Sequence, residues 1–217
     1  MNLEDLERID SKKMYQTYDK WPEIAKNSFN NDFEKFDAKG IDHIVFSGMG
    51  GSGSIGDVIS AILSKEDIHV SNVKGYHLPK TVDSNSLVLS TSISGNTKET
   101  LAVLEKAQKT DAKIAVFSSG GMIQKFSKTN NLFFQKIPMI HSPRVSFAQF
   151  LFSILNILKE IIPIKKIDVE EAISSLEITK KNIFSTNLTE ENIALKLAEW
   201  IKEIPLIYYP WGLQSAA

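Results

Sequence analysis

Two segments of this 217-residue chain are rich in glycine or in hydroxyl side chains, residue types that bind anions without a metal. Residues 48–53 read Gly-Met-Gly-Gly-Ser-Gly, and residues 90–97 read Ser-Thr-Ser-Ile-Ser-Gly-Asn-Thr. Glycines let backbone N–H groups approach an anion at the start of a helix, where the helix dipole favours negative charge. Serine and threonine hydroxyls supply further donors. Together these segments predict a phosphate site built mainly from neutral hydrogen-bond donors.

The glycine segment also satisfies the G-x-G-x-x-G fingerprint of dinucleotide-binding domains. That fingerprint needs an acidic residue at the end of the second strand, which holds a ribose hydroxyl. Residues 70–76 contain no acidic residue, and Asp67 comes before the expected strand. Dinucleotide binding is therefore disfavoured. In the serine-rich segment, Ser92 and Ser94 are the better candidates for binding a phosphate, because helix capping does not require them.

Other polar residues near these segments have a structural explanation beside the functional one. Asn96, with Glu99 three residues later, is close to a capping box, which makes it a helix cap rather than a ligand. Residues 118–121, Ser-Ser-Gly-Gly, either border the ligand or form a plain turn. Arg144 offers a fixed fork of donors for a phosphate or an enolate oxygen, although a lone arginine before a helix is most often a surface residue.

The apolar pattern places these segments in an α/β fold with a doubly wound, five-stranded parallel sheet flanked by helices. Apolar residues at helical spacing follow both the glycine and the serine segment. In such a sheet the loops after the strands meet at one edge, where ligands bind. Short apolar runs predict strands at residues 43–46, 68–73, 87–89, 113–117 and 132–134.

Helices are also expected before and after this sheet. An early helix is predicted to start at Pro22, since proline is favoured in a first helical turn. A helix beginning near residue 147 is apolar on most sides, which predicts burial, with a subunit interface as one place where it could be buried. Two more helices are expected at about residues 168–184 and 189–203, the second capped by Thr189.

Composition narrows the function classes. The 25 Lys and Arg residues against 26 Asp and Glu leave a formal charge of -1, so no global basic field attracts nucleic acid or anionic lipid. The chain has no cysteine and only scattered histidines, so no metal site or thiol chemistry is expected. Neither a signal peptide nor a membrane span is recognised. We therefore predict a cytoplasmic protein with no nucleic-acid or membrane partner.

At residues 48–53 and 92–101 the sequence resembles the sugar isomerase (SIS) domain family. Within it, the chain is most similar to the archaeal-type bifunctional phosphoglucose/phosphomannose isomerases. Residues 118–121 and 143–144 fall where that family has similar segments, and the resemblance runs from about residue 40 to the last residue. Ile93 departs from the pattern, because the family often has an aromatic residue there.

This resemblance implies two SIS domains in tandem that work as a homodimer, with no metal or organic cofactor. The implied reaction interconverts glucose 6-phosphate or mannose 6-phosphate with fructose 6-phosphate through an enediolate. The residues that match the family's site are Gly51 and Ser52 for contact with the hexose 6-phosphate, Ser92, Ser94 and Thr97 for its phosphate, and Arg144 for stabilising the intermediate.

The resemblance also implies a division of the chain. A helical lead-in (1–40) precedes the SIS domain (41–160), a helical connection (161–204) follows, and residues 205–217 begin a second SIS domain. The family's catalytic glutamate, histidine and lysine have no match here. We therefore expect the phosphate-binding half of an isomerase, inactive as this chain alone.

Two alternatives stay open. The chain could be a non-catalytic phosphosugar-binding module, although the lead-in has no DNA-binding helix pair or basic segment of a regulator. It could also be another SIS isomerase, acting on amino-sugar phosphates or phosphoheptoses. The segment around Arg144 favours the phosphoglucose/phosphomannose reading over that second alternative.

Overall fold

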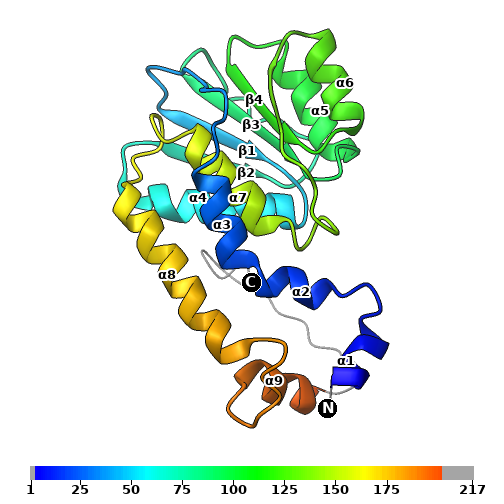
Figure 1. Ribbon diagram of the computed structural model, residues 1–217. Coiled ribbons are helices and arrows are strands. Elements are labelled where there is room, and N and C mark those ends of the chain that lie inside the picture. Colours follow the sequence, from blue (N-terminus) through cyan, green and yellow to red (C-terminus); the bar gives the residue numbers. More distant parts are fainter. Residues whose placement is uncertain (1–2, 202–217) are drawn as a thin grey trace.

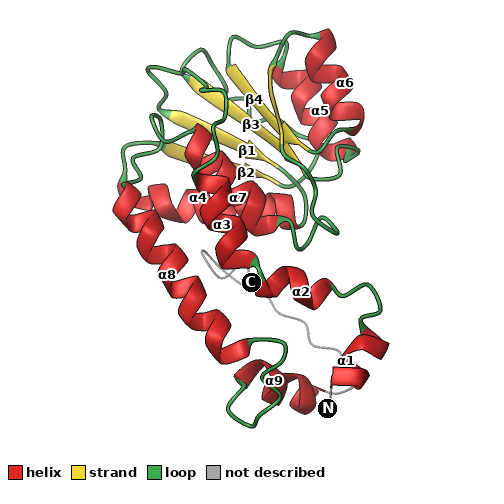
Figure 2. Ribbon diagram, in the orientation of Figure 1, coloured by secondary structure: helices red, strands yellow, loops and turns green. Residues whose placement is uncertain are grey.

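The computed structural model describes residues 3–201. All five strands are parallel and form one sheet in the order β2-β1-β3-β4-β5, which confirms the predicted doubly wound sheet (Figure 1, Figure 2). The strand predicted at the start of residues 205–217 lies outside the described residues. The strands are β1 (His43–Ser47), β2 (His69–Val73), β3 (Ser86–Ser92), β4 (Lys113–Ser118) and β5 (Phe133–Lys136).

Helices connect the strands and extend the chain on both sides of the sheet. Those between strands are α4 (Gly51–Ile62) with the short 3-10 turn η1 (Leu63–Lys65), α5 (Lys98–Ala107) and α6 (Gly121–Thr129). Those before β1 are α1 (Leu3–Ile9), α2 (Met14–Asp19) and α3 (Trp21–Phe29). Those after β5 are α7 (Phe147–Ile157), α8 (Lys166–Ile183) and α9 (Ile193–Ile201). Pro22 lies in the first turn of α3, as predicted.

Side chains of the central strand β1 point alternately to the two faces of the sheet. Ile44 and Phe46 belong to the larger core, whereas Val45 belongs to a core on the opposite face. Helices α3, α4 and α7 close the larger core, and α5 and α6 cover the other face (Figure 1). Burial on both faces explains the short apolar runs at residues 44–46 of β1 and 87–89 of β3.

Helix α7 lies between the sheet and α3. Nine of its 11 residues are buried. The indole N–H of Trp21, at the start of α3, donates to the Val145 carbonyl at 2.9 Å, and the Trp21 and Phe147 rings lie 6.2 Å apart. The predicted burial of this helix is thus confirmed. The chain itself provides it, so the apolar character of α7 does not indicate a subunit interface.

The N-terminus of α9 corrects one predicted helix cap. The helix starts after Asn192, whose Oδ1 accepts hydrogen bonds from two first-turn backbone N–H groups at 3.0 and 3.2 Å. The predicted cap, Thr189, instead donates its hydroxyl to Asn187 at 2.7 Å. Both residues suit a cap by type, and the structure has the cap at Asn192.

The helical lead-in is not separate from the sheet in space, because Ala25 of α3 belongs to the larger core. The division at residues 40, 160 and 204 stays a prediction. Between residues 3 and 201, no helix combines the length and the apolar character needed to cross a membrane.

His43, at the start of β1, is a buried titratable side chain, 7% exposed. Burial lowers the pKa of His43, and the neighbouring His69, whose ring lies 4.9 Å away, lowers it further. The His43 Nε2 atom lies 2.9 Å from the Ser71 hydroxyl. The environment therefore favours the neutral imidazole.

This environment predicts how stability depends on pH. As pH falls below 6.5, the ordinary pKa of histidine, the unfolded chain should take up a proton at His43 before the folded chain does. The free energy of unfolding should fall until pH passes the lowered pKa of the folded state, with a slope of at most about 1.4 kcal/mol per pH unit. Urea unfolding of wild type and His43→Gln between about pH 8 and about pH 5 measures this contribution. The exposed His77→Gln is the control, and an equal pH dependence in all three proteins would contradict the prediction.

Candidate functional site

The glycine loop (residues 48–53) and the serine loop (residues 90–97) meet at the carboxyl edge of the sheet. Strand β1 pairs with β2 on one side and with β3 on the other. The sheet therefore changes its direction of growth between β1 and β3. In doubly wound sheets this switch point opens the crevice that binds ligands. Strand order thus brings together the two segments that the sequence singled out.

The backbone of Ile93 joins the serine loop to both neighbouring loops. Its N–H donates to Ser52 Oγ at 3.3 Å. Its carbonyl accepts from the backbone N–H and the hydroxyl of Ser119, at 3.3 and 2.6 Å. The Ile93 side chain is 2% exposed in the larger core. Ser52 Oγ therefore accepts a hydrogen bond within the protein. Its hydroxyl hydrogen stays available for another acceptor.

Within the serine loop, the side chains of Ser92 and Thr97 are coupled. Their hydroxyl oxygens lie 2.8 Å apart, and Ser92 Oγ also accepts the Gly95 N–H at 3.1 Å. Ser92 is buried, whereas Thr97 is half-buried and Ser94 is exposed. The contact of Ser94 Oγ with the Asn96 N–H is long, 3.5 Å. Ser92 thus shapes the loop, and Ser94 and Thr97 present their hydroxyls at its surface.

Asn96 does not cap the helix that follows it, which corrects the prediction from sequence. Thr97 occupies the cap position of α5, and no side chain caps that helix among the described residues. Asn96 Oδ1 instead accepts the N–H of Met122 at 3.1 Å, and the Gly95 carbonyl accepts the N–H of Ile123 at 3.0 Å. The serine loop therefore fills the N-terminus of α6. The first-turn N–H groups of α5 stay available to an anion.

Residues 118–121 are more than a plain turn, because they contact the serine loop; whether they also border the ligand stays a prediction. The Ser118 hydroxyl donates to the Gly120 carbonyl at 3.1 Å and accepts the Gly120 N–H at 3.2 Å. Gly95 and Gly121 adopt left-handed φ values of 74° and 73°, and a Cβ on Gly95 would overlap the Gly120 carbonyl. The two backbones thus touch where a side chain would separate them.

Gly51 and Arg144 complete the predicted site residues. Gly51 is exposed at the start of α4, and a Cβ there would meet nothing within 4 Å. Arg144 is exposed in the segment that leaves the carboxyl end of β5, and no side chain among residues 3–201 pairs with its guanidinium. Burial raises the pKa of Tyr18, and the charge of Arg144 opposes that rise. The structure therefore groups five predicted residues at the switch point, and no described hydrogen bond links Arg144 to them.

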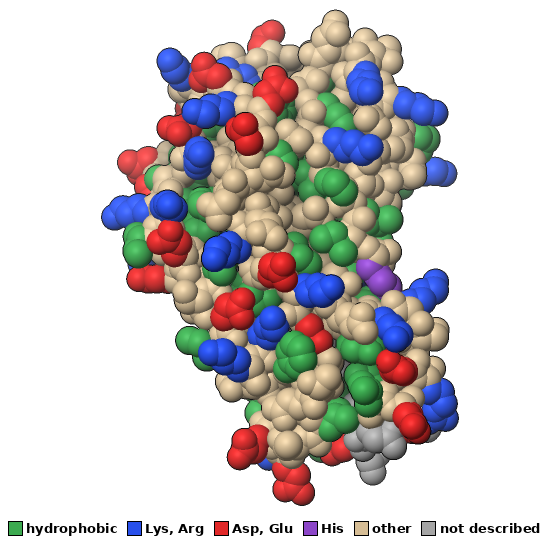
Figure 3. Space-filling view, in the orientation of Figure 1, with side chains coloured by type: hydrophobic (Ala, Val, Ile, Leu, Met, Phe, Trp, Pro, Cys, Tyr) green, Lys and Arg blue, Asp and Glu red, His purple; other side chains and the backbone are tan. Residues whose placement is uncertain are grey.

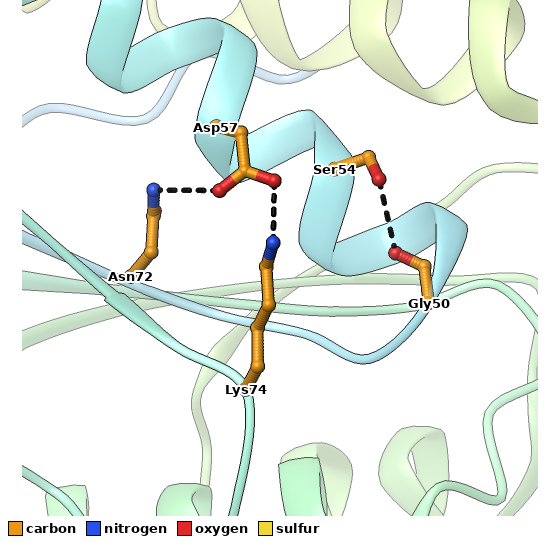
Figure 4. A network of polar contacts seen from close by, with 5 residues as sticks. All are labelled: Gly50, Ser54, Asp57, Asn72 and Lys74. Carbon is orange, nitrogen blue, oxygen red and sulfur yellow. Dashed lines mark hydrogen bonds and ion pairs between the residues drawn. The ribbon is translucent and has the colours of Figure 1, made fainter. Parts of the chain in front are cut away.

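Lys74, which the sequence analysis missed, lies beside the glycine loop. It follows β2 directly and forms an ion pair with Asp57 of α4 at 2.5 Å (Figure 4). Asp57 also accepts from the Asn72 amide at 3.2 Å, and its side chain is only 12% exposed. A Cβ on Gly53 would lie 3.2 Å from Lys74 Cε. The sequence could have pointed to Lys74 by its residue type, because a lysine stands where a dinucleotide-binding domain carries an acidic residue.

Charges of both signs are interspersed over the face of the molecule seen in Figure 3. Near α5, the charge of Glu99 raises the pKa of the Tyr76 hydroxyl, with a smaller contribution from burial. Within residues 3–201, no three His, Asp or Glu side chains gather where they could hold a metal ion. The polar groups that the two loops present are hydroxyls and backbone N–H groups, which form hydrogen bonds.

A family model decides what kind of domain this is. The model of the SIS domain matches residues 39–136, the stretch that contains all five strands and both loops. The chain contains a SIS domain. The resemblance drawn from residues 48–53 and 92–101 is thereby confirmed.

Relatives of this SIS domain act on phosphosugars. The chain is 36% identical over 175 residues to a bifunctional phosphoglucose/phosphomannose isomerase of Thermoplasma acidophilum, covering 81% of this chain and 52% of that protein. It is 28% identical over 148 residues to a D-glucosamine-6-phosphate 4-epimerase of Sulfolobus acidocaldarius, covering 68% of this chain and 46% of that protein. The chain spans about half the length of the curated relatives it matches.

A solved structure shares the fold of this SIS domain. A protein of Clostridium difficile 630, assigned as a phosphosugar isomerase, superposes with a TM-score of 0.61 at 19% sequence identity. The match covers 88% of this chain and 56% of that one. At this identity the likeness shows the fold alone.

The contact between Gly95 and Gly120 predicts a strong effect of one methyl group. Gly95→Ala should lower the free energy of unfolding by about 2 kcal/mol or more, because it adds a Cβ to a left-handed residue and forces two backbones apart. Gly51→Ala is the matched control and should be neutral or stabilising by up to about 1 kcal/mol, since it lies in a helix with open space around it. Chemical denaturation measures both, and equal stability of the two variants would contradict the described loop.

The ion pair of Lys74 and Asp57 predicts a second difference in stability. Lys74→Met should cost about 1–2 kcal/mol, because it leaves the largely buried Asp57 carboxylate with only an amide partner. The control is Lys166→Met, whose partner Glu170 lies 3.5 Å away with both side chains exposed, and which should cost about 0.5 kcal/mol or less. A Lys74 variant no less stable than the control would show that the pair does not hold α4 against β2.

Proposed function

We propose that this chain is the phosphosugar-binding part of a cytoplasmic, homodimeric aldose–ketose isomerase. Its substrates are glucose 6-phosphate or mannose 6-phosphate and its product is fructose 6-phosphate. The observation that carries the proposal is the N-terminus of α5, which no described side chain caps and which lies beside the hydroxyls of Ser94 and Thr97. The SIS domain and its phosphosugar isomerase relatives support it.

The phosphate is held at the serine loop. Ser94 and Thr97 donate their hydroxyls, and the first-turn N–H groups of α5 add donors along the helix dipole. Ser92 fixes the position of Thr97 through the 2.8 Å contact of their hydroxyl oxygens. Neutral donors arranged in advance bind a phosphate without large reorganisation, because their positions are set by the protein and not by the ligand.

The sugar extends from β3 toward β1. A phosphate at the serine loop leaves the glycine loop as the neighbouring surface, since β3 pairs directly with β1. Gly51 presents an exposed backbone there, and Ser52 has a hydroxyl hydrogen for a sugar oxygen. Carbons 1 and 2 of the sugar then lie over the glycine loop.

Isomerisation moves a proton between carbons 1 and 2, which requires a base and stabilisation of the developing negative oxygen. Arg144 supplies the stabilisation with its guanidinium, which has no partner among residues 3–201. Its chain segment leaves the carboxyl end of β5, on the edge of the sheet that carries both loops. The acid and base groups come from outside the matched residues, in keeping with relatives about twice as long. The chain alone binds hexose 6-phosphate and does not isomerise it.

An amino-sugar phosphate is the second candidate substrate. The epimerase relative from Sulfolobus acidocaldarius is named for D-glucosamine 6-phosphate, and the match covers 68% of this chain. The same phosphate site serves both substrate classes. Relative affinities for fructose 6-phosphate and glucosamine 6-phosphate separate the two candidates.

Calorimetric titration with fructose 6-phosphate tests the phosphate site. Ser94→Ala should weaken binding by about 1–3 kcal/mol, roughly fivefold to more than a hundredfold, because it removes a donor to a phosphate oxygen. Its stability should be unchanged, since Ser94 is exposed and makes only the long contact with Asn96.

Two controls accompany this titration. Ser174→Ala removes an exposed hydroxyl on α8 and should leave affinity unchanged. NADH should not bind, since Lys74 replaces the acidic residue that a dinucleotide site needs. Wild-type affinity in Ser94→Ala, or saturable binding of NADH at the same loops, would overturn the proposed function.

A further inference from the structure

A second polar pocket lies between the end of α3, the end of β5 and the beginning of α7. Its volume is about 620 Å³, within the range of small-molecule sites. Its walls come from residues 27–33, residues 135–138 and two residues of α7, Gln149 and Ser153. None of these belongs to the glycine loop or the serine loop. The pocket is therefore separate from the proposed phosphate site and does not depend on it.

Two residues of α7 that line this pocket each carry a buried polar atom without a described partner. Ser153 is 1% exposed, and neither its Oγ nor Gln149 Oε1 has a hydrogen-bond partner among the described residues. The two residues are four positions apart and so share one face of the helix. Asn156 on the same helix is paired, since its amide donates to the Asn31 carbonyl at 2.7 Å. A buried polar group without a partner lowers the stability of a protein by about 1–3 kcal/mol. A hydrogen-bond partner for these two groups would remove that cost.

The chemistry of the walls defines what the pocket accepts. Its buried part holds a hydroxyl, Ser153, an amide oxygen, Gln149, and the apolar Ile137, with no buried charge. A charged group placed there would be desolvated without a counter-charge. A hydroxyl group suits both atoms, because it donates to an amide oxygen and can accept from a serine hydroxyl.

The rim of the pocket adds exposed polar groups on an open side. Asn27 and Asn31 contribute amides, and Lys136 and Asp32 contribute opposite charges that form no ion pair with each other. Phe33 supplies an apolar surface for C–H groups. Amides, carboxylate, ammonium and an aromatic ring together match the alternating hydroxyl and C–H groups of a carbohydrate.

We propose that this pocket binds a neutral polyhydroxyl compound, a free sugar or a polyol. Ser153 and Gln149 hydrogen-bond its buried hydroxyls. The amides and charges of the rim bind the hydroxyls that face solvent. The ligand lacks a phosphate, since the only cation on the walls, Lys136, is at the exposed rim.

Amide NMR titration with glucose and with sorbitol tests this site, because it locates weak binding by residue. Saturable shifts are expected at the backbone of residues 27–33, 135–138 and 149–153. Ser153→Ala should weaken binding about tenfold, by loss of one buried hydrogen bond. Its melting temperature should be unchanged or higher, because the hydroxyl has no partner in the described protein. Ser174→Ala, on the exposed face of α8, should bind as wild type does.

Other outcomes would overturn the proposal. Absence of shifts in these segments at saturating sugar, or wild-type affinity in Ser153→Ala, would exclude the site. If Ser153→Ala loses its fold, Gln149→Met replaces it, with the same loss of affinity required. Fructose 6-phosphate is the third ligand, and shifts from it confined to residues 92–97, with none from glucose or sorbitol, would assign all sugar binding to the serine loop. Ser94→Ala should bind glucose and sorbitol normally, so failure of the proposed function and failure of this site are distinguishable.

Discussion

The site depends on one peptide position, Ile93. Its N–H is bound by Ser52 at the start of α4, and its carbonyl is bound twice by Ser119 after β4. Three loops that leave three neighbouring strands are thus joined through one residue, whose side chain is anchored in the core. The serine loop has little freedom to change shape when a ligand binds. That rigidity suits recognition by neutral donors, whose strength lies in their placement.

Two helices, α5 and α6, begin near the serine loop. Asn96 and Gly95 satisfy first-turn N–H groups of α6, and Thr97 is engaged by Ser92 instead of capping α5. The polar groups of this short loop thereby bind α6 and one another, and none of them caps α5. The helix that stays uncapped is the one whose N-terminus adjoins the exposed hydroxyl of Ser94. In the proposed function an anion takes the place of the missing cap, which links the structure of the loop to that proposal.

The N-terminal helix α3 packs against the larger core, on the side of α7. Helix α3 packs on α7 and is tied to it by the bond from Trp21 to Val145. Ser153 and Gln149 of α7 carry buried polar atoms without a described partner, and both residues line a pocket that α3 also borders. The structure thus has a polar pocket where α3 adjoins the edge strand β5, apart from the two loops at the switch point of the sheet.

The sequence by itself determined the five strands and the helices that follow the two loops, and it predicts the loops as the place for an anion. Each of these depends on residue types close together in the chain, such as the apolar run of β1 and the hydroxyls of residues 90–97. Only the tertiary structure decided what Asn96, Lys74 and Ser153 do. Asn96 binds a residue 26 positions away, and Lys74 binds one 17 positions away. Ser153 faces a pocket whose other walls come from the lead-in and from β5. Strand order and helix packing bring such partners together, and local sequence carries no signal of that approach.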